Sequence, residues 1–348
     1  MILVFLNSIK PQFLNTLNIL NSITLIRLVN ALKLYLSFRI AVLLKKPIHF
    51  GFPMALSIEP TTACNLGCPE CPSGLKQFTR KTGNLTLELH EKIINESYKN
   101  LMYINYYFQG EPYINPNLFE MISHSTSKNI FCSTSTNGHF LTDKNCKKTI
   151  NSGLQNLIIS IDGNSQESYV EYRKKGDFER VKKGAKNLVS WKNKLKSKYP
   201  HIILQFLIVK TNEHLINDMK DLCDELGLDE FRIKTAQFYD YQNGNPLMPI
   251  NEQYSRYRKN KNGRYELKNK LNNQCWRMWS SCVVTVNGEI VPCCFDKDAK
   301  YQLGKLKSES LREIWKSKDY THFRSMILTN RNGVDICKNC SEGTKVWA

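Results

Sequence analysis

From residue 54 onward the chain alternates between short apolar segments and longer segments whose apolar positions recur with helical spacing. The short segments are rich in β-branched and aromatic residues, a composition that favours strands. Two of the longer segments have clear helical limits: one opens at Thr86 and runs to about Asn100, and another runs from Asn212 to Leu226 and stops at a glycine. The pattern predicts six strands, at residues 54–60, 104–109, 130–136, 157–162, 202–210 and 230–235.

Six strand–helix units in succession predict an α/β fold, in which a parallel sheet with crossover helices is open or partly closed into a barrel. Ligands of such folds bind at the carboxyl ends of the strands. Turn chemistry explains a glycine, asparagine or aspartate at any one strand end. Unusual residues after five consecutive strands, however, predict a binding edge. They are Cys64–Cys71, Gly110–Pro112, Asn137–Gly138, Asp162–Gly163 and Asn212.

Residues 1–50 are predicted to form an N-terminal amphipathic helical extension, because apolar residues recur every three to four positions from Leu25 to Leu43. Polar and basic residues interrupt the apolar run, so we expect no bilayer-crossing helix. The first acidic residue is Glu59. Two interpretations remain open: the helix attaches to an anionic membrane face, or it packs on the catalytic domain. The basic residues of this region are Lys10, Arg27, Lys33, Arg39, Lys45 and Lys46.

The composition of the 348 residues is globular, with 41% hydrophobic and 23% charged residues. The 49 lysines and arginines exceed the 31 acidic residues, and the resulting net charge of +18 favours an anionic partner. The basic residues are scattered and are not gathered with aromatic residues on one segment, so we expect no nucleic-acid partner.

The first residues lack the basic leader and the cleavage site of a secretory signal. We therefore expect a cytoplasmic protein, in contact with the inner face of the membrane if the N-terminal helix binds lipid. In that reducing compartment the twelve cysteines favour metal or redox chemistry over disulfides.

Three of the cysteines stand in the sequence CNLGCPEC, at Cys64, Cys68 and Cys71, directly after the first predicted strand. A structural zinc takes four ligands, and a fourth is missing nearby. A four-iron four-sulfur cluster is normally held by four thiolates as well. With three thiolates, one iron stays open and can bind a substrate or cofactor directly, as the open position of a catalytic zinc does.

This motif and its position resemble the CxxxCxxC loop of the radical S-adenosylmethionine (radical SAM) enzymes. The resemblance implies a partial (β/α)6 TIM-like barrel at residues 51–240 and a SAM-binding 4Fe-4S cluster on the three cysteines. In that family the reduced cluster cleaves bound SAM to a 5'-deoxyadenosyl radical, which abstracts hydrogen from the substrate. The residue before the third cysteine is commonly aromatic in the family, whereas this chain has Glu70, so the adenine contacts match less well than the cluster ligands.

Further segments resemble the SAM-binding segments of the family one by one. FQGEP at 108–112 resembles the GGEP segment, in which Glu111 would accept from the SAM amino group, although Gln109 departs from the pattern. STNG at 135–138 and SIDG at 160–163 resemble the segments after the third and fourth strands. Arg173 resembles the residue that pairs with the SAM carboxylate, with a solvated helix charge as the alternative. The resemblance implies as cofactor-binding residues Gly110, Glu111, Asn137, Ser160, Arg173 and Asn212.

More cysteines follow a stretch rich in tyrosine, asparagine and lysine at 241–274, which predicts a linker or a solvated surface. Residues 283–292 predict a β-hairpin with an Asn-Gly turn. The cysteine pattern of residues 275–348 resembles the twitch domain, a shortened relative of the SPASM domain that binds one auxiliary 4Fe-4S cluster. A structural zinc on the same thiolates is the alternative. The resemblance implies as ligands Cys275, Cys293, Cys337 and Cys340, for which Cys282 or Cys294 could substitute.

The remaining cysteines, Cys132, Cys146 and Cys223, lie in predicted strands or helices, and we expect them to be small buried hydrophobic residues. A hydrogen-abstracting enzyme can also need a proton donor or acceptor. The candidates at the predicted edge are Lys234 and Tyr239 after the sixth strand and His139 after the third, and the sequence does not rank them.

The resemblance implies an oxidoreductase-like radical SAM enzyme with two clusters and an electron donor such as flavodoxin or ferredoxin. We expect oxidation of a sugar, a polyol or a glycolipid head group, because the spacing of the last cysteines resembles twitch-type dehydrogenases of aminocyclitol biosynthesis. The substrate would then be a small or lipid-linked molecule. Peptide modification is the alternative, although residues 1–50 lack the hairpin pattern of a peptide-binding module. A zinc-bearing nucleic-acid-binding protein is the alternative from another class.

Overall fold

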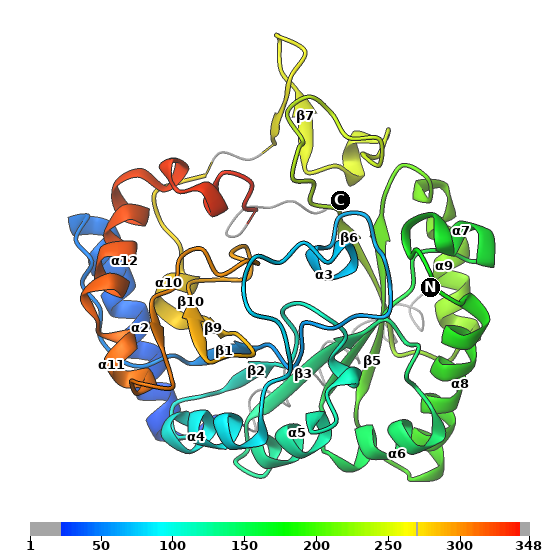
Figure 1. Ribbon diagram of the computed structural model, residues 1–348, viewed down its shortest axis with the longest axis horizontal. Coiled ribbons are helices and arrows are strands. Elements are labelled where there is room, and N and C mark those ends of the chain that lie inside the picture. The colour runs from blue at the N-terminus through cyan, green and yellow to red at the C-terminus, as the bar shows by residue number, and fades with distance from the viewer. Residues whose placement is uncertain (1–21, 269–270, 342–348) are drawn as a thin grey trace, which may run out of the picture.

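The computed structural model describes residues 22–268 and 271–341, and one large sheet organises them (Figure 1). Its strands follow the order β11-β10-β9-β1-β2-β3-β4-β5-β6. Neighbours from β1 to β6 pair in parallel, so the predicted parallel sheet is confirmed. The six strands overlap the six predicted segments, although β2 is shorter than predicted and begins one residue earlier: β1 (Ala55–Ile58), β2 (Tyr103–Asn105), β3 (Phe131–Thr136), β4 (Asn156–Ser160), β5 (His201–Ile208) and β6 (Glu230–Thr235).

Helices cover the outer face of these parallel strands, along the lower and right edges of Figure 1. Thr86, Thr142 and Asp177 each accept a hydrogen bond from a backbone N–H three residues on, which caps the first turn of the helix that follows. Each helix buries an apolar stripe in the common core. The helices are α4 (Leu87–Ser97), α5 (Leu118–Thr126), α6 (Asp143–Asn151), α7 (Gln166–Tyr172), α8 (Phe178–Lys194) and α9 (Ile216–Glu225).

The C-terminal region continues the same sheet. The predicted hairpin is confirmed as β9 (Ser281–Val284) and β10 (Glu289–Val291), and β9 pairs in parallel with β1. This pairing brings residues after 275 to the carboxyl edge of β1, where the first cysteines are. The other elements of the region are α10 (Arg277–Ser280), β11 (Gly304–Lys305), α11 (Leu311–Trp315), α12 (Lys318–Asn330) and the 3-10 turns η4 (Arg331–Gly333) and η5 (Asp335–Cys337).

The stretch predicted as a linker, 241–274, has structure of its own. It forms an antiparallel pair, β7 (Tyr257–Lys259) and β8 (Tyr265–Leu267), which projects at the top of Figure 1. Met248 and Tyr257 are buried in a small core with Leu66 and Cys68 of the cysteine loop. Most of the stretch is exposed or half-buried, as expected for the solvated-surface alternative. The polar composition concealed the few apolar residues of this core, and the Asn262-Gly263 turn was the signal for the hairpin.

The described part of the N-terminal extension contains the predicted helix, α2 (Leu25–Leu44). Residues 1–21, with Lys10, lie outside the described residues. The helix packs on the protein, but through Arg27, Asn30, Leu34, Ser37 and Ala41 rather than through the predicted apolar stripe. Among the helices that the structure describes, none has the length and hydropathy to cross a membrane.

Candidate active site

A cavity of about 250 Å³ lies at the carboxyl ends of the parallel strands. All three cysteines of the first motif line it. The predicted residues that join them on its wall are Gly110, Glu111, Asn137, Ser160 and Arg173. These residues were predicted from separate sequence motifs. The structure brings them together at one cavity, from the ends of four strands and one helix.

The cysteine loop folds back on itself through its backbone. The Cys71 N–H donates to the Cys68 carbonyl oxygen at 3.2 Å, and Cys71 occupies the N-cap position of the short helix α3 (Pro72–Leu75) without a side-chain capping bond. Proline suits the first turn because its missing N–H would have no partner there. Gly74 passes so close that a Cβ at this position would lie 2.7 Å from the Cys68 nitrogen. The loop therefore depends on a glycine to turn its three thiols toward one cavity.

Glu111 is 2% exposed, and its carboxylate is held by three donors. The Thr136 hydroxyl and the Asn137 N–H donate to it at 2.7 Å each, and the Tyr113 N–H donates at 3.2 Å. Burial raises the pKa of Glu111 to about 7, while these hydrogen bonds favour the charged form. The preceding Gly110 has a φ of 73°, and a Cβ there would clash with the Thr61 carbonyl oxygen. The turn thus presents an acceptor suited to an ammonium group.

Arg173 belongs to a buried ion pair and is not a solvated helix charge. Its Nε donates to the Asp162 carboxylate at 2.5 Å, and its Nη1 lies 4.0 Å from the Cys68 sulfur. Asp162 also accepts the Leu207 N–H at 2.7 Å, so it joins β5 to the site. The sequence placed Asp162 at the predicted binding edge but did not indicate that it pairs with Arg173, since an Asp-Gly pair after a strand is also a common turn.

Asn212 does not line this cavity. It is 1% exposed, and its amide donates to the carbonyl oxygens of Asp162 and Leu207 at 3.0 Å each. Its side-chain oxygen accepts the Val209 N–H at 2.8 Å. Asn212 therefore links the end of β5 to the end of β4 by hydrogen bonds. It supports the site without lining its cavity.

His139 does not line a cysteine cavity either. Its Nε2 lies 2.9 Å from the Asp177 N–H, which donates to it, and its Nδ1 lies 3.2 Å from the Asn137 carbonyl oxygen. Burial lowers the pKa of His139, which agrees with a neutral ring that accepts at Nε2. Both nitrogens are engaged in joining loops, so the geometry gives His139 a structural position.

The two departures from the family pattern face away from the first cavity. Glu70 accepts a hydrogen bond from the Asn245 amide at 2.9 Å, which ties the cysteine loop to the segment predicted as a linker. Gln109 donates to the Phe108 carbonyl oxygen at 2.8 Å. Neither side chain is on the wall of the first cavity, so the departures leave its lining intact.

The second set of cysteines also meets at one cavity, which is almost closed, with a volume of about 10 Å³. Its walls are largely apolar, and the Arg331 Nη2 lies 3.4 Å from the Cys340 sulfur. Cys282 is instead part of β9, opposite Leu56, and Cys294 is not on this wall. The cysteines that line the cavity are Cys275, Cys293, Cys337 and Cys340. Cys132, Cys146 and Cys223 are buried in the main core, as predicted.

Both thiol sets supply the ligand type of iron–sulfur clusters and each lines one cavity, although among the described residues no three His, Cys, Asp or Glu are arranged to hold a single metal ion. Burial raises the pKa of Cys64 to about 11 and that of Cys337 to about 12, so these thiols lose their protons only to a strongly binding metal centre. Arg173 beside Cys68 and Arg331 beside Cys340 supply positive charge next to the thiolates that would form. The first set has three thiols and an open cavity, and the second has four thiols and a closed one.

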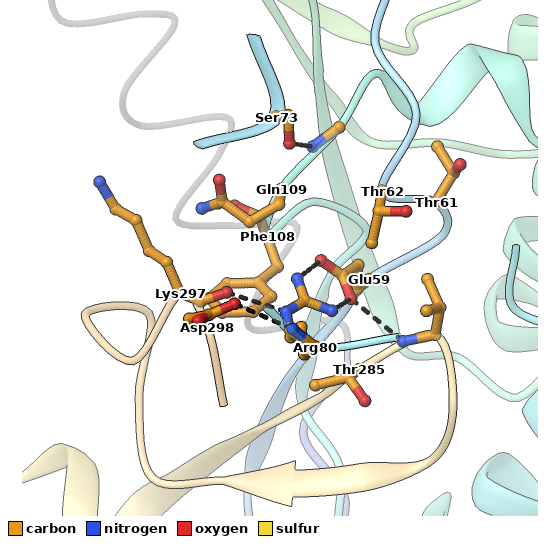
Figure 2. A network of polar contacts seen from close by, with 12 residues as sticks. Glu59, Thr61, Thr62, Ser73, Arg80, Phe108, Gln109, Thr285, Lys297 and Asp298 are labelled. Atoms are coloured by element: carbon orange, nitrogen blue, oxygen red, sulfur yellow. Dashed lines mark hydrogen bonds and ion pairs between the residues drawn. The ribbon is translucent and has the colours of Figure 1, made fainter. Parts of the chain in front are cut away.

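A buried network of hydrogen bonds around Arg80 and Glu59, called the clasp below, connects the two cysteine-bearing regions (Figure 2). Arg80 donates to both oxygens of Glu59, at 2.8 and 2.5 Å, and its Nε donates to the Lys297 carbonyl oxygen at 2.9 Å. Glu59 also accepts the Val286 N–H at 3.1 Å, and Asp298 accepts the Arg80 N–H at 3.3 Å. The segment after the first cysteines is thereby fixed to the segment after Cys293 and Cys294. No local pattern marked Arg80, because its partners lie far away along the chain.

A third and larger cavity, of about 660 Å³, lies between α3 and the segment that carries Cys337. Its wall includes Tyr239 and Lys297, whose ammonium lies 4.7 Å from the centre of the Tyr239 ring. Lys234 lines the first cavity instead. Its side chain is accessible within that cavity, yet the surrounding protein and then the Arg256 charge lower its pKa. The structure therefore places two of the three predicted proton-transfer residues on cavity walls.

Comparison with known proteins identifies two domains in the chain. Residues 58–199 match the Radical SAM superfamily. Residues 275–341 match SPASM, the iron–sulfur cluster-binding domain. The first match contains the three-cysteine loop and the second contains all four cysteines of the closed cavity, and together they cover more than half of the chain.

Two curated relatives match along most of their length. The tungsten-containing aldehyde ferredoxin oxidoreductase cofactor-modifying protein of Pyrococcus furiosus is 25% identical over 82% of this chain and 86% of its own. The S-adenosyl-L-methionine-dependent 2-deoxy-scyllo-inosamine dehydrogenase of Niallia circulans is 21% identical over 82% of this chain and 92% of its own.

Among solved structures, Streptococcus suis SuiB bound to the precursor peptide SuiA has the same fold, with a TM-score of 0.59 and 15% identity over 88% of this chain and 75% of SuiB. The partial barrel and its C-terminal extension are thus a known architecture. The chain belongs to the radical SAM superfamily: it is an iron–sulfur enzyme with a SPASM-type domain, and its cofactors are SAM, the SAM-binding 4Fe-4S cluster and an auxiliary 4Fe-4S cluster.

Proposed function

We propose that this enzyme oxidises a small polyol, a sugar or a glycolipid head group by removing hydrogen from a carbinol carbon. The observation that carries the proposal is the cavity of about 660 Å³ between the two cysteine regions. Its wall combines α3, which follows the SAM-cluster loop, with residues next to Cys337 and with Phe295, which also lines the closed cavity. The volume is in the range of small-molecule sites, and a substrate there would lie between the two clusters.

In this proposal each lining side chain has a defined part. Glu111 accepts from the SAM ammonium, and Arg173, held in place by Asp162, pairs with the SAM carboxylate. Ser160 and Asn137 complete the wall of that pocket, with Gly110 allowing the close turn and Asn212 supporting the loop. Cys64, Cys68 and Cys71 bind the SAM cluster. The auxiliary cluster is bound by Cys275, Cys293, Cys337 and Cys340.

When bound, SAM and the reduced cluster supply the 5'-deoxyadenosyl radical, and the auxiliary cluster supplies a site for one electron. Loss of a hydrogen atom from the carbon, one electron and the hydroxyl proton leaves a carbonyl group. Lys234 and Tyr239 are the candidates to receive that proton, because each reaches a cavity wall. The lowered pKa of Lys234 makes its neutral form easier to reach, but Lys234 lines the SAM cavity, so it would accept the proton only from a substrate that extends into that cavity.

The dehydrogenase relative supports oxidation of a small alcohol, since its name describes that reaction on an aminocyclitol. Peptide modification remains the second candidate, because SuiB has the same fold and binds a precursor peptide. The iron–sulfur family assignment leaves the third interpretation, a zinc-bearing nucleic-acid-binding protein, without support.

The proposal includes an electron donor of the flavodoxin or ferredoxin type and a substrate that is either free or linked to lipid. It also places the enzyme in the cytoplasm, with contact to the inner face of the membrane through residues 1–50. A lipid-linked substrate would agree with that placement, because its reactive head group lies at the membrane surface.

The test measures 5'-deoxyadenosine formed by the anaerobically reconstituted and reduced protein with SAM and size-fractionated extract of the source cells. We expect stimulation by the small-molecule or lipid fraction, with a product two hydrogens lighter than its substrate. Stimulation by the peptide fraction alone would contradict the proposal in favour of peptide modification. The Cys68→Ala variant serves as the control for SAM cleavage that does not depend on the cluster.

A further inference from the structure

Helix α2 is attached to the protein by a mixed face, in which Arg27, Asn30 and Ser37 are buried beside Leu34 and Ala41 and Phe38 packs on Trp276 and Trp279. The inward residues are Arg27, Asn30, Leu34, Ser37 and Ala41, and none of them is more than 5% exposed. An ordinary surface helix such as α8 instead buries its apolar stripe. The α2 helix packs against α10 and is drawn in blue at the left edge of the molecule in Figure 1.

Specific hydrogen bonds fix this orientation. The Arg27 guanidinium donates to the carbonyl oxygens of Tyr98 and Lys128 at 2.9 Å each. The Asn30 side chain exchanges two hydrogen bonds with the Phe52 backbone, both at 2.8 Å. Rotation of the helix would leave these buried groups unpaired, at about 1–3 kcal/mol for each group. The helix therefore cannot turn its apolar side inward without a large loss.

The outward side of α2 carries large apolar side chains along its whole length. Leu25, Leu32, Leu36 and Leu43 are 77%, 55%, 48% and 80% exposed, and their spacing of seven, four and seven residues places them on one line. Leu28, Val29 and Ile40 flank that line and are also exposed. Twenty helical residues extend about 30 Å. A continuous apolar strip of this length marks an interaction surface.

The exposed charges on α2 itself and directly after it are all positive. Lys33, Arg39, Lys45 and Lys46 are exposed on α2 or directly after it. No carboxylate side chain occurs in the sequence before Glu59. Leucines between exposed cations match an anionic lipid surface, where apolar side chains enter the acyl boundary and cations meet the phosphates. A second copy on this strip would instead bring the cations of both helices together.

We propose that α2 is an in-plane membrane anchor that binds an anionic phospholipid surface through its leucine strip. The helix lies flat, with Leu32 and Leu36 at the centre of the contact and the cations at the headgroups. This inference rests on the proposed membrane contact and defines the face that makes it. It does not depend on the proposed reaction.

The test is flotation of the full-length reconstituted protein with two kinds of vesicle, phosphatidylcholine alone and phosphatidylcholine with an equal part of phosphatidylglycerol. We expect binding to the anionic vesicles only, and weaker binding as salt is raised, because salt screens the headgroup charge. The double variant Leu32→Glu, Leu36→Glu should bind at least about tenfold less, because each leucine loses its apolar burial.

The matched control is the double variant Leu195→Glu, Ile250→Glu, which changes the same chemistry at two exposed positions elsewhere and should float like the original protein. Iron content and 5'-deoxyadenosine formation without vesicles report separately on folding and on the reaction. Equal binding of both double variants would overturn the proposal. So would a protein that ignores the anionic vesicles but changes from dimer to monomer with Leu32→Glu, Leu36→Glu, since the strip would then bind a second copy.

Discussion

The two cysteine sites of this enzyme are built in opposite ways. The first takes three thiols from a single loop of eight residues, Cys64–Cys71, and turns them toward a cavity of about 250 Å³ that also contains Glu111 and Arg173. The second gathers four thiols from three separate segments around a cavity of about 10 Å³ with mostly apolar walls. One site leaves room for a ligand beside its thiols, whereas the other leaves almost none.

The two sites differ in how far apart along the chain the residues that build them lie. The loop site takes all three thiols from one turn that closes at Gly74, although distant residues such as Asn245 hold that loop in place. The closed site exists only after β9 has paired with β1 and after α12 has packed under it. We therefore expect the first site to be sensitive to changes in chemistry and the second to be sensitive to changes in folding.

The largest contrast is expected from one cysteine removed at each site. Cys68→Ala should reduce 5'-deoxyadenosine formation to background while the auxiliary cluster remains, so bound iron falls by about half, as expected for the loss of one of two four-iron clusters. Cys337→Ala should also lose about half of the iron, but it should still cleave SAM when substrate is absent. Iron analysis and product assay of both variants check this. Equal loss of SAM cleavage in the two variants would remove the distinction.

The next largest effect is expected from mutation of the clasp, the buried Arg80–Glu59 network that connects the two sites. Arg80→Ala leaves the Glu59 carboxylate buried without its partner, which should lower stability by about 3–5 kcal/mol. The thermal midpoint of the reconstituted protein is the measurement. The double variant Glu59→Gln, Arg80→Met should recover much of the loss, because no buried charge remains. A midpoint for Arg80→Ala within a degree of the original protein would show that the clasp contributes little.

A smaller effect is expected at the SAM-binding carboxylate. Glu111→Gln should weaken SAM binding about 10- to 100-fold, the value of a hydrogen bond to a charged group. The pKa of Glu111 is raised to about 7, so the carboxylate is neutral below that pH and charged above it. SAM affinity of the original protein should therefore fall as the pH drops below about 7, and that dependence should disappear in Glu111→Gln. Equilibrium dialysis at several pH values tests both statements.

The smallest effect is expected at Ser160, a neutral hydroxyl on the same wall. Ser160→Ala should weaken SAM binding by about fivefold, the equivalent of one neutral hydrogen bond of about 1 kcal/mol. The same dialysis measures it. A loss as large as that of Glu111→Gln would mean that the hydroxyl, and not the carboxylate, is the main anchor of SAM.

Features that are encoded by neighbouring residues could be predicted from the sequence. Six strands, the Asn-Gly hairpin and the three-cysteine loop are each encoded by neighbouring residues, and the structure confirms the strands and the hairpin. The gathering of Cys275, Cys293, Cys337 and Cys340 at one cavity was implied by a family resemblance, because no local rule connects residues so far apart.

The other features of the structure depend on contacts between residues far apart in the sequence, so the sequence did not predict them. Nothing near Arg80 in the sequence indicates that Glu59, Lys297 and Asp298 will surround it. The α2 helix was predicted, but its periodicity suggested that the leucines would face inward, or toward a membrane, with equal weight. Only the burial of Arg27 and Asn30 decides that they face outward. Periodicity gives the two faces of a helix, and the hydrogen-bonding partners decide which face is buried.

The most direct test of the account is electron paramagnetic resonance of the reduced, reconstituted protein with and without SAM. We predict two cluster signals, of which SAM changes only the one that Cys68→Ala removes and leaves unchanged the one that Cys337→Ala removes. A SAM-induced change in the signal lost with Cys337→Ala, or no response of either signal to SAM, would contradict the assignment of an open site at Cys64–Cys71 and a closed site at the C-terminus.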